Sequence, residues 1–268
     1  MLIGKRGAAT TSISSASADA VTIRGHDLAG DLLGTASFTD VFFLLATGRM
    51  PSPDQRFFLD VCLVAIAEHG LTPSVQAARM TYAADPAALQ GAVAAGVLGC
   101  GTVILGAADQ CRSLLERVLE GAATGIGIAA SALAVARDYR ASKTPIPGYG
   151  HPLHKPIDPR AERMIALAHE RHTAGRAVGA AVELSKAVQT TWGKPLPMNV
   201  SMAIAATMLD LDVPAALIRG IPILARTAGL IAHLAEEATT PIGFLLASKA
   251  EEAIEHTQSS DSSGAAPR

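Results

Sequence analysis

Residues 148–160 read GYGHPLHKPIDPR, and their composition differs from that of the apolar sequence on either side. Two glycines flank Tyr149, so a ligand can approach the backbone closely there. His151 carries an imidazole, which can transfer a proton near neutral pH. Lys155 and Arg160 are cations that can hold phosphate and carboxylate groups. This segment predicts a binding loop; the alternative is a proline-rich connector whose charges are merely solvated.

A second segment, GKPLPMNVS at residues 193–201, also has a composition that helix packing does not explain. Loops that are held by a rigid scaffold are the usual place for binding and catalytic residues. We therefore expect binding chemistry in these two segments, which a rigid helical frame would hold.

Helical patterns surround both segments. Apolar residues recur at helical spacing, and Pro, Asp and Thr mark several helix starts. Few runs alternate as strands do; short N-terminal strands are expected near Ile3, near Ile13 and over residues 21–23. The predicted helices span residues 40–47, 54–68, 73–83, 109–120, 125–140, 158–172, 174–192, 200–209, 214–237 and 244–256. An uncharged run over residues 86–108 is predicted to be helical and to break near Gly99–Gly101. The fold class is therefore all-α.

The composition excludes several classes of protein. The chain has 268 residues, of which 49% are hydrophobic and 17% are charged, so it is neither disordered nor fibrous. Its 22 basic and 24 acidic residues leave no basic excess, and only 4% of residues are aromatic. A nucleic-acid partner is not expected from such a chain.

The cysteines and the termini favour a cytoplasmic protein. Cys62, Cys100 and Cys111 have no metal-ligand spacing, and their odd number is typical of reduced, buried thiols. The N-terminal arm, residues 1–19, is polar and lacks the apolar stretch of a signal peptide. The tail, residues 257–268, is rich in Ser, Gly, Ala and Pro and is predicted to be disordered.

The uncharged stretch at residues 91–108 is long enough to span a bilayer, but we do not expect it to do so. It contains five glycines and many alanines, and it lacks an aromatic belt and basic anchors. This stretch and residues 214–237 are apolar nearly all round, which predicts burial on every side. Small residues such as Gly96 allow helices to approach closely, so we predict a homodimer or a higher homo-oligomer with helices of both chains at its centre.

Two residues outside the loops are further candidates. His69 follows Glu68 at a predicted helix end, where the helix dipole also favours a cation without any function. Arg226 lies within an apolar helix, so its charge requires a partner from the protein or from an anionic ligand.

Taken together, the motifs resemble those of the citrate synthase family over most of the chain. The order and approximate spacing of six segments agree with the family pattern. These segments are TIRGHDL (22–28), FTDVFFLLATGRMP (38–51), AEHG (67–70) with the following PSVQAARM, GYGHPLHKPIDPR (148–160), LPMNVS (196–201) and LARTAGLIAHLAEE (224–237).

The resemblance implies a role for each matching residue. His69 and His151 would contact the hydroxy and keto oxygen of a citrate-like group. Arg160 and Arg226 would bind its carboxylates, and Lys155 would reach a phosphate of coenzyme A. Family members make or break a carbon–carbon bond between an acyl-CoA and a 2-keto acid. The resemblance implies a coenzyme A thioester as the substrate, with no permanently bound cofactor and no metal.

Three positions depart from the family pattern. Leu105 stands where the family has a catalytic histidine, and Ser201 stands where it has a catalytic aspartate. A serine hydroxyl cannot exchange protons as a carboxylate does. Thr240 replaces an arginine that precedes a proline. The missing histidine and the shortened segment between Pro51 and His69 resemble lyase-type members of the family.

We therefore predict a citrate-synthase-like protein with a large helical domain (20–107 and 204–256) and a small helical domain (108–203). The predicted activity is that of a citryl-CoA lyase-like enzyme, which cleaves a 3-hydroxyacyl-CoA to an acyl-CoA and a 2-keto acid. His151 would take the hydroxyl proton, and His69 and Ser201 would complete the catalytic set. A citrate or 2-methylcitrate synthase and a non-catalytic CoA-ester-binding paralogue are the alternatives.

Overall fold

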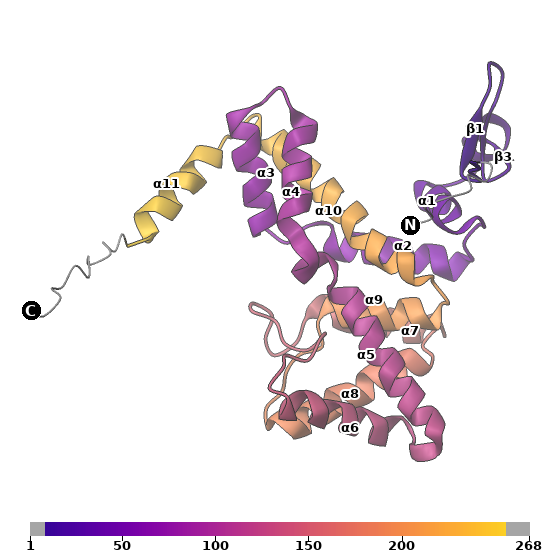
Figure 1. Cartoon of the computed structure of the whole chain (residues 1–268), viewed down its shortest axis with the longest axis vertical. Helices are drawn as coiled ribbons and strands as arrows, with labels where there is room; N and C mark the ends of the chain where they lie inside the picture. Colours follow the sequence, from indigo (N-terminus) through magenta and orange to yellow (C-terminus); the bar gives the residue numbers. More distant parts are fainter. Residues whose placement is uncertain (1–8, 256–268) are drawn as a thin grey trace, which may run out of the picture. The chain divides into compact units, whose positions relative to one another are not determined.

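The computed structural model describes residues 9–255, and helices dominate that range (Figure 1). The all-α prediction is confirmed. The predicted disordered tail at 257–268, the strand expected near Ile3 and residues 1–8 of the N-terminal arm lie outside the described residues.

Every helix predicted from the sequence is present, and the ends differ from the prediction by a few residues. The α-helices are α1 (Phe38–Thr47), α2 (Pro53–Ala67), α3 (Pro73–Ala84), α4 (Leu89–Leu105), α5 (Ala107–Gly121), α6 (Ile128–Ala141), α7 (Pro159–Glu170), α8 (Arg176–Trp192), α9 (Val200–Asp210), α10 (Ala215–Glu237) and α11 (Gly243–Ala253). There are also two short π-helical turns: η1 (Leu28–Leu32) precedes α1, and η2 (Ala122–Ile126) lies between α5 and α6.

Local capping explains where the first helices begin. The Ser37 side chain accepts a hydrogen bond from the backbone of Asp40, and the Asp40 carboxylate accepts one from the backbone of Ser37. Ser52 and Gln55 make the same reciprocal pair at the start of α2, with Pro53 in its first turn. Such pairs satisfy backbone N–H groups that have no partner within the helix.

The N-terminal residues form a small antiparallel sheet in the order β1-β2-β3. Its strands are β1 (Ser14–Ala16), β2 (Val21–Ile23) and β3 (His26–Asp27). The strands predicted near Ile13 and over residues 21–23 are therefore confirmed. The third strand has only two residues, which is too short for an alternating pattern to reveal.

The chain divides into two compact units, and the first comprises residues 1–68 and 101–226. Within it α6 lies against α8, and α5 and α7 both lie against α9 (Figure 1). Helix α9 is the centre of this unit, because its side chains from Met202 to Met208 are all buried. Alanines at several contact positions, such as Ala203 and Ala206, let the neighbouring helices approach it closely.

The second unit comprises residues 69–100 and 227–268 and has its own small apolar core. The buried residues of this core are Val75, Ala78, Ala92, Leu230 and Leu234. Gly96 faces it, and a Cβ atom added there would lie 2.6 Å from Leu230 Cδ2. A glycine is therefore needed where α4 and α10 approach each other.

The chain passes between the units at Glu68, at Gly101 within α4 and at Arg226 within α10. Gly101 has a non-helical backbone (φ 55°, ψ −173°), so the break predicted near Gly99–Gly101 is confirmed. The large and small domains expected from the sequence, 20–107 with 204–256 and 108–203, divide the chain at other positions and stay a prediction.

The cysteine prediction is also confirmed. Cys62, Cys100 and Cys111 are free thiols with buried side chains. Burial raises the pKa of the Cys62 and Cys111 thiols, because a thiolate would lose its hydration there.

The expected burial of α4 and α10 on every side is wrong for the single chain. Leu98 on α4 is 81% exposed, and Ile231 on α10 is 48% exposed. Residues 89–126 and 215–237 are each long and apolar enough to cross a bilayer, and their most apolar windows are only 24% and 39% buried. That they instead belong to a soluble protein stays a prediction.

A buried ion pair joins three helices of the second unit. Arg79 Nε donates to Glu237 Oε2 at 2.6 Å, and Arg79 Nη1 donates to Glu236 Oε2 at 2.7 Å. The other oxygen of Glu237 accepts from the backbone of Ile242 and Gly243, where α11 begins. The pair therefore ties α3 and α10 to the start of α11.

Replacing Arg79 by Met should lower the free energy of unfolding by about 3–5 kcal/mol, because it leaves the Glu237 carboxylate buried without its cation. Arg163→Met is the matched control, since Arg163 and Glu170 are both more than half exposed. The control should cost under about 1 kcal/mol. Urea unfolding of the two variants and the wild type measures the difference; equal losses would contradict a role for the buried pair.

The same pair gives a prediction for pH. Burial alone would raise the pKa of Glu237, but the hydrogen bonds from Arg79 and from the start of α11 hold it below 4.5. A carboxyl whose pKa is lowered on folding stabilises the protein above its unfolded pKa. The loss of unfolding free energy caused by Arg79→Met should therefore be largest near neutral pH, and it should become smaller as the pH falls below 4.5.

Candidate active site

The two segments singled out from the sequence lie side by side in the first unit. The backbone of Gly150 donates to the carbonyl of Pro197 at 2.7 Å, and the backbone of Asn199 donates to the carbonyl of Gly148 at 2.9 Å. Between these bonds Tyr149 and Met198 form an antiparallel bridge. The two segments are therefore paired through their backbones, and their role in binding stays a prediction.

Gly148 and Tyr149 anchor the first segment in the core. Gly148 has φ +82°, and a Cβ atom there would lie 2.6 Å from Met202 Cε and 2.8 Å from Cys111 Sγ. Tyr149 is buried, and its hydroxyl donates to the carbonyl of Ala181 at 2.7 Å. Burial raises the pKa of Tyr149, so this phenol stays protonated and has an anchoring role.

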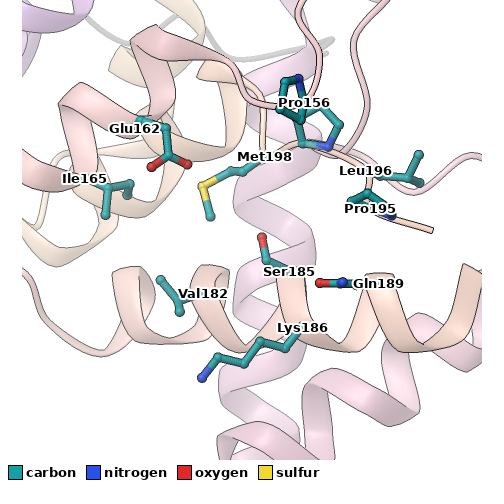
Figure 2. A pocket seen from close by; sticks show the side chains of 11 residues that line it. Pro156, Glu162, Ile165, Val182, Ser185, Lys186, Gln189, Pro195, Leu196 and Met198 are labelled. Carbon is teal, nitrogen blue, oxygen red and sulfur yellow. The ribbon is translucent and has the colours of Figure 1, made fainter. Parts of the chain in front are cut away.

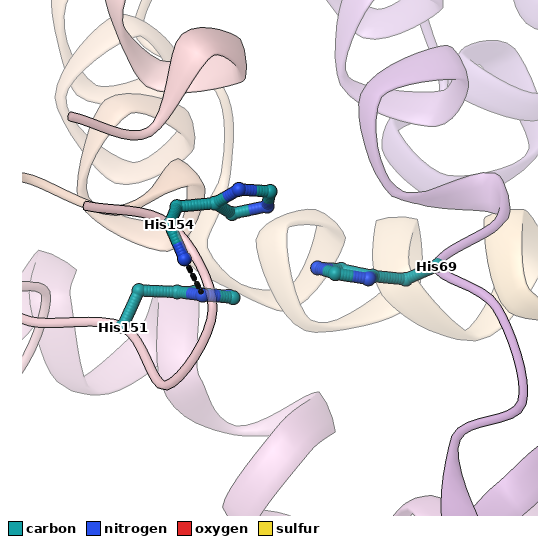
Figure 3. Close-up of side chains that lie close together, drawn as sticks. All are labelled: His69, His151 and His154. Carbon is teal, nitrogen blue, oxygen red and sulfur yellow. Dashed lines mark hydrogen bonds between the residues drawn. The ribbon is translucent and has the colours of Figure 1, made fainter. Parts of the chain in front are cut away.

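His151 is held by its own loop. Its Nδ1 accepts hydrogen bonds from the backbone N–H groups of Leu153, at 3.1 Å, and His154, at 3.0 Å; Figure 3 marks the second bond. An Nδ1 that accepts cannot carry a proton, so the hydrogen-bond pattern assigns the neutral tautomer with its proton on Nε2. His151 is thereby prepared to donate a hydrogen bond to a substrate oxygen through Nε2–H.

Asp158 positions Arg160 and the start of α9. It has no solvent-exposed surface, and its carboxylate accepts from Arg160 Nε at 3.0 Å and from Arg160 Nη2 at 2.8 Å. It also accepts from the backbone N–H of Val200 at 3.1 Å. Burial alone would raise the pKa of Asp158, but these bonds and the arginine charge hold it below its usual range. Asp158 uses two of the five N–H groups of Arg160, which leaves donors for a ligand.

Ser201 lies in the first turn of α9 and is half-buried. Asn199 caps this helix, since its Oδ1 accepts from the backbone of Ser201 at 3.1 Å and of Met202 at 3.4 Å. Asn199 Nδ2 also donates to the carbonyl of Gly150 at 3.2 Å. The cap therefore holds Ser201 against the loop that carries His151.

Arg226 lies on α10 at the end of the first unit. Its Nη1 is buried and has no hydrogen-bond partner within the described part of the chain. A buried guanidinium nitrogen without an acceptor is costly. The position thus has the property expected of a residue that binds an anionic ligand.

The remaining candidates differ in their burial. His69 is half-buried, follows α2 and belongs to the second unit. Lys155 is exposed on the loop, and Leu105 is half-buried at the end of α4. Thr240 is exposed, and its carbonyl accepts from Arg79 at 3.4 Å, so in this chain it supports the ion pair of the second unit.

A pocket of about 370 Å³ lies beside this loop, between α7, α8 and the second segment (Figure 2). Pro156 and Met198 line it together with the polar side chains of Glu162, Ser185 and Gln189. The sequence did not identify these polar residues, although Ser185 and Gln189 are four residues apart and therefore lie on one face of α8. It also did not assign a role to His154, which lies three residues after His151.

Comparisons with known proteins agree on a family. Residues 51–243 match the family described as "Citrate synthase, C-terminal domain". The chain is 31% identical to the citrate synthase of Synechocystis sp. over 207 residues, which are 73% of this chain and 48% of that protein. The citrate synthase of Acidithiobacillus ferridurans is 27% identical over 205 residues, 73% of this chain and 50% of that one. The chain thus spans about half the length of the curated relatives that it matches.

Two solved structures are similar over nearly the whole chain. The citryl-CoA lyase from Hydrogenobacter thermophilus is 30% identical with a TM-score of 0.81, and the match covers 97% of this chain and 96% of that one. The ATP citrate lyase from Methanothrix soehngenii, in complex with citrate and coenzyme A, has the same fold with a TM-score of 0.78 at 22% identity. That match covers 98% of this chain and 44% of the larger protein.

Gly148→Ala should destabilise the protein more than Gly150→Ala. Both glycines have positive φ, so an alanine at either costs about 1–2 kcal/mol. Only the Gly148 methyl group would collide with Met202 and Cys111, which adds about 1–3 kcal/mol. Chemical unfolding of both variants tests this, and equal free energies of unfolding would contradict the close packing at Gly148.

Proposed function

The chain belongs to the citrate synthase family, and from that premise we propose that it is a carbon–carbon lyase. Its substrate is a 3-hydroxyacyl-CoA of the citryl-CoA type, and its products are an acyl-CoA and a 2-keto acid. The observation that carries the proposal is the end-to-end match, at 30% identity, with the citryl-CoA lyase from Hydrogenobacter thermophilus. The matched part of this chain covers only about half of each curated citrate synthase in the comparison, 48% and 50%.

The reaction requires three things of the site. The bond between the α- and β-carbons of the thioester breaks, and its electron pair moves to an enolate of the acyl-CoA. The β-hydroxyl loses its proton and becomes the keto group. The enolate carbon then takes up a proton, so the reaction is redox-neutral and needs no co-reactant.

His151 stabilises the oxygen that becomes the keto group. Its Nε2–H donates to that oxygen, while two backbone N–H groups hold its Nδ1. This replaces the role of proton acceptor expected from the sequence, because the tautomer with a proton on Nε2 has no free acceptor there. A fixed donor aimed at the reacting oxygen is worth about 2.7–4 kcal/mol in comparable enzymes.

The cations bind the ends of the substrate. Arg160, held by Asp158, and Arg226, with its buried Nη1, bind carboxylates of the keto-acid half. Lys155 is exposed and directly precedes Pro156, which lines the pocket of Figure 2. Lys155 binds a phosphate of coenzyme A while the pocket holds another part of that molecule. His69 keeps its predicted role as a contact of the keto-acid half.

Ser201 and Leu105 support one competing function. Neither side chain has a titratable group at the positions where the family has an aspartate and a histidine. A paralogue that binds CoA esters without turning them over would need neither of those groups. The acyl-transfer direction of a citrate synthase is supported less, because deprotonating an acyl-CoA requires a base that both positions lack.

Incubation with citryl-CoA and related 3-hydroxyacyl-CoA esters tests the proposal, with thioester loss and keto-acid release as readouts. Arg226→Gln should raise KM for the hydroxyacyl ester about tenfold or more, because one carboxylate loses its charged partner. Arg219→Gln is the control on the same helix, since Arg219 is exposed and pairs with Asp109; it should change KM by less than about twofold. Binding of CoA esters without any release of keto acid would instead establish the non-catalytic paralogue.

The exposed apolar faces of α4 and α10 support a homodimer. Leu98→Glu should weaken it by about tenfold or more, because a charge would be buried in the contact. Leu33→Glu, at a site of the N-terminal region that is 65% exposed, should leave the dimer unchanged. Light scattering at micromolar concentration measures the mass, and a monomeric wild type would contradict the assembly.

A further inference from the structure

Two imidazole rings stack within the loop of residues 148–160. The ring centroids of His151 and His154 are 4.4 Å apart, and the ring planes meet at 29°. Both side chains are half-buried, and Figure 3 shows both rings projecting to the same side of the loop. His154 is therefore placed to reach what His151 reaches.

The groups already assigned in this part of the first unit leave one step of the reaction without an agent. His151 accepts at Nδ1 and carries its proton on Nε2, so it donates rather than accepts. The Tyr149 hydroxyl donates a hydrogen bond to the carbonyl of Ala181, and the Asp158 carboxylate accepts hydrogen bonds from Arg160 and Val200. Ser201 is a neutral hydroxyl. None of these side chains can take the proton of the substrate hydroxyl.

We infer that His154 is this missing base, a second catalytic imidazole beside His151; the inference rests on the proposed lyase function. One ring nitrogen of His151 and one of His154 lie within 4.8 Å of each other. Two ordinary hydrogen bonds that meet at one oxygen span up to about 5.6 Å. A single substrate oxygen at the edge of the two rings can therefore lie within hydrogen-bond distance of both nitrogens.

The step balances without any further reactant. His154 takes the proton of the β-hydroxyl as the bond between the α- and β-carbons breaks. The oxygen becomes the keto oxygen and accepts the hydrogen bond from His151 Nε2–H. The electron pair of the broken bond forms the thioester enolate, and the proton on His154 then passes to the enolate carbon.

The stacking is consistent with this division of roles. Two imidazolium ions 4.4 Å apart would repel each other, so the pair favours at most one positive charge. The backbone N–H groups at Nδ1 leave His151 as a donor through Nε2–H, so His154 is the imidazole of the pair that takes the proton of the substrate hydroxyl. Lys155 is the next residue, but it is exposed and, as an ammonium, has no lone pair to accept a proton.

His154→Ala and His154→Gln test the assignment, with citryl-CoA and related esters as substrates. Both variants should lose about a hundredfold or more in kcat, because neither side chain can take a proton, while KM stays within about threefold. Added imidazole should raise the kcat of His154→Ala about tenfold, since it fills the vacated space, and should not change that of His154→Gln. His169→Ala, at an exposed position on α7, is the matched control and should keep wild-type turnover.

The outcomes separate this inference from the proposed function. A wild type that cleaves these esters, together with a His154→Gln variant within threefold of its kcat, would overturn the role of His154 and leave the lyase standing. Loss of kcat in His154→Ala that glutamine restores would overturn it as well, because glutamine can position a substrate but cannot move a proton. If the wild type cleaves none of the esters, both the proposed lyase function and the role of His154 as its base are wrong. Circular dichroism checks folding, and His154→Gln decides the matter if His154→Ala does not fold.

Discussion

The site depends on one buried carboxylate. Asp158 accepts from the side chain and backbone of Arg160 and from the backbone of Val200, so it joins the start of α7, a guanidinium and the start of α9. Helix α9 is buried along nearly all its length, and its position is therefore set by the core of the first unit. Asp158 links the loop of residues 148–160 to this buried helix, which holds the loop in place. Burying the Asp158 carboxylate would be costly without the positive charge of Arg160, so the burial of Asp158 depends on Arg160.

Backbone groups, rather than a carboxylate, set the state of His151. Two N–H groups at Nδ1 fix the proton on Nε2, because the hydrogen bond at one ring nitrogen decides the tautomer at the other. They come from Leu153 and His154, within the same turn. Backbone hydrogen bonds that pair Gly148 and Gly150 with residues 197–199 fix this turn. The chemistry of the imidazole thus follows from the path of the main chain.

Much of the fold could be predicted from the sequence because its signals are local. Serine caps, prolines at helix starts and the glycines near Gly101 each act within a few residues, and the observed helices follow them. The binding loop was also recognisable, because its charged and imidazole groups interrupt an apolar chain. The partners across the chain were not predictable: nothing local shows that Asp158 meets Val200 or that Arg79 meets Glu237. The exposure of α10 was not predictable for a related reason, since an apolar helix face does not reveal how much of it the rest of the chain covers.

In the proposed lyase reaction, Ser201 is not the group that transfers the proton. An aspartate at the start of α9 would be held charged by the helix dipole, and it would need only one turn of backbone to position it. Here Asn199 already occupies the backbone N–H groups of Ser201 and Met202, so this helix end offers a neutral hydroxyl and no open anion site. Tyr149 is fixed as a phenol by burial, and Asp158 by its arginine. The proposed reaction therefore assigns proton transfer to the loop of residues 148–160, where the main chain fixes His151 as a donor and the stacked His154 is the inferred base.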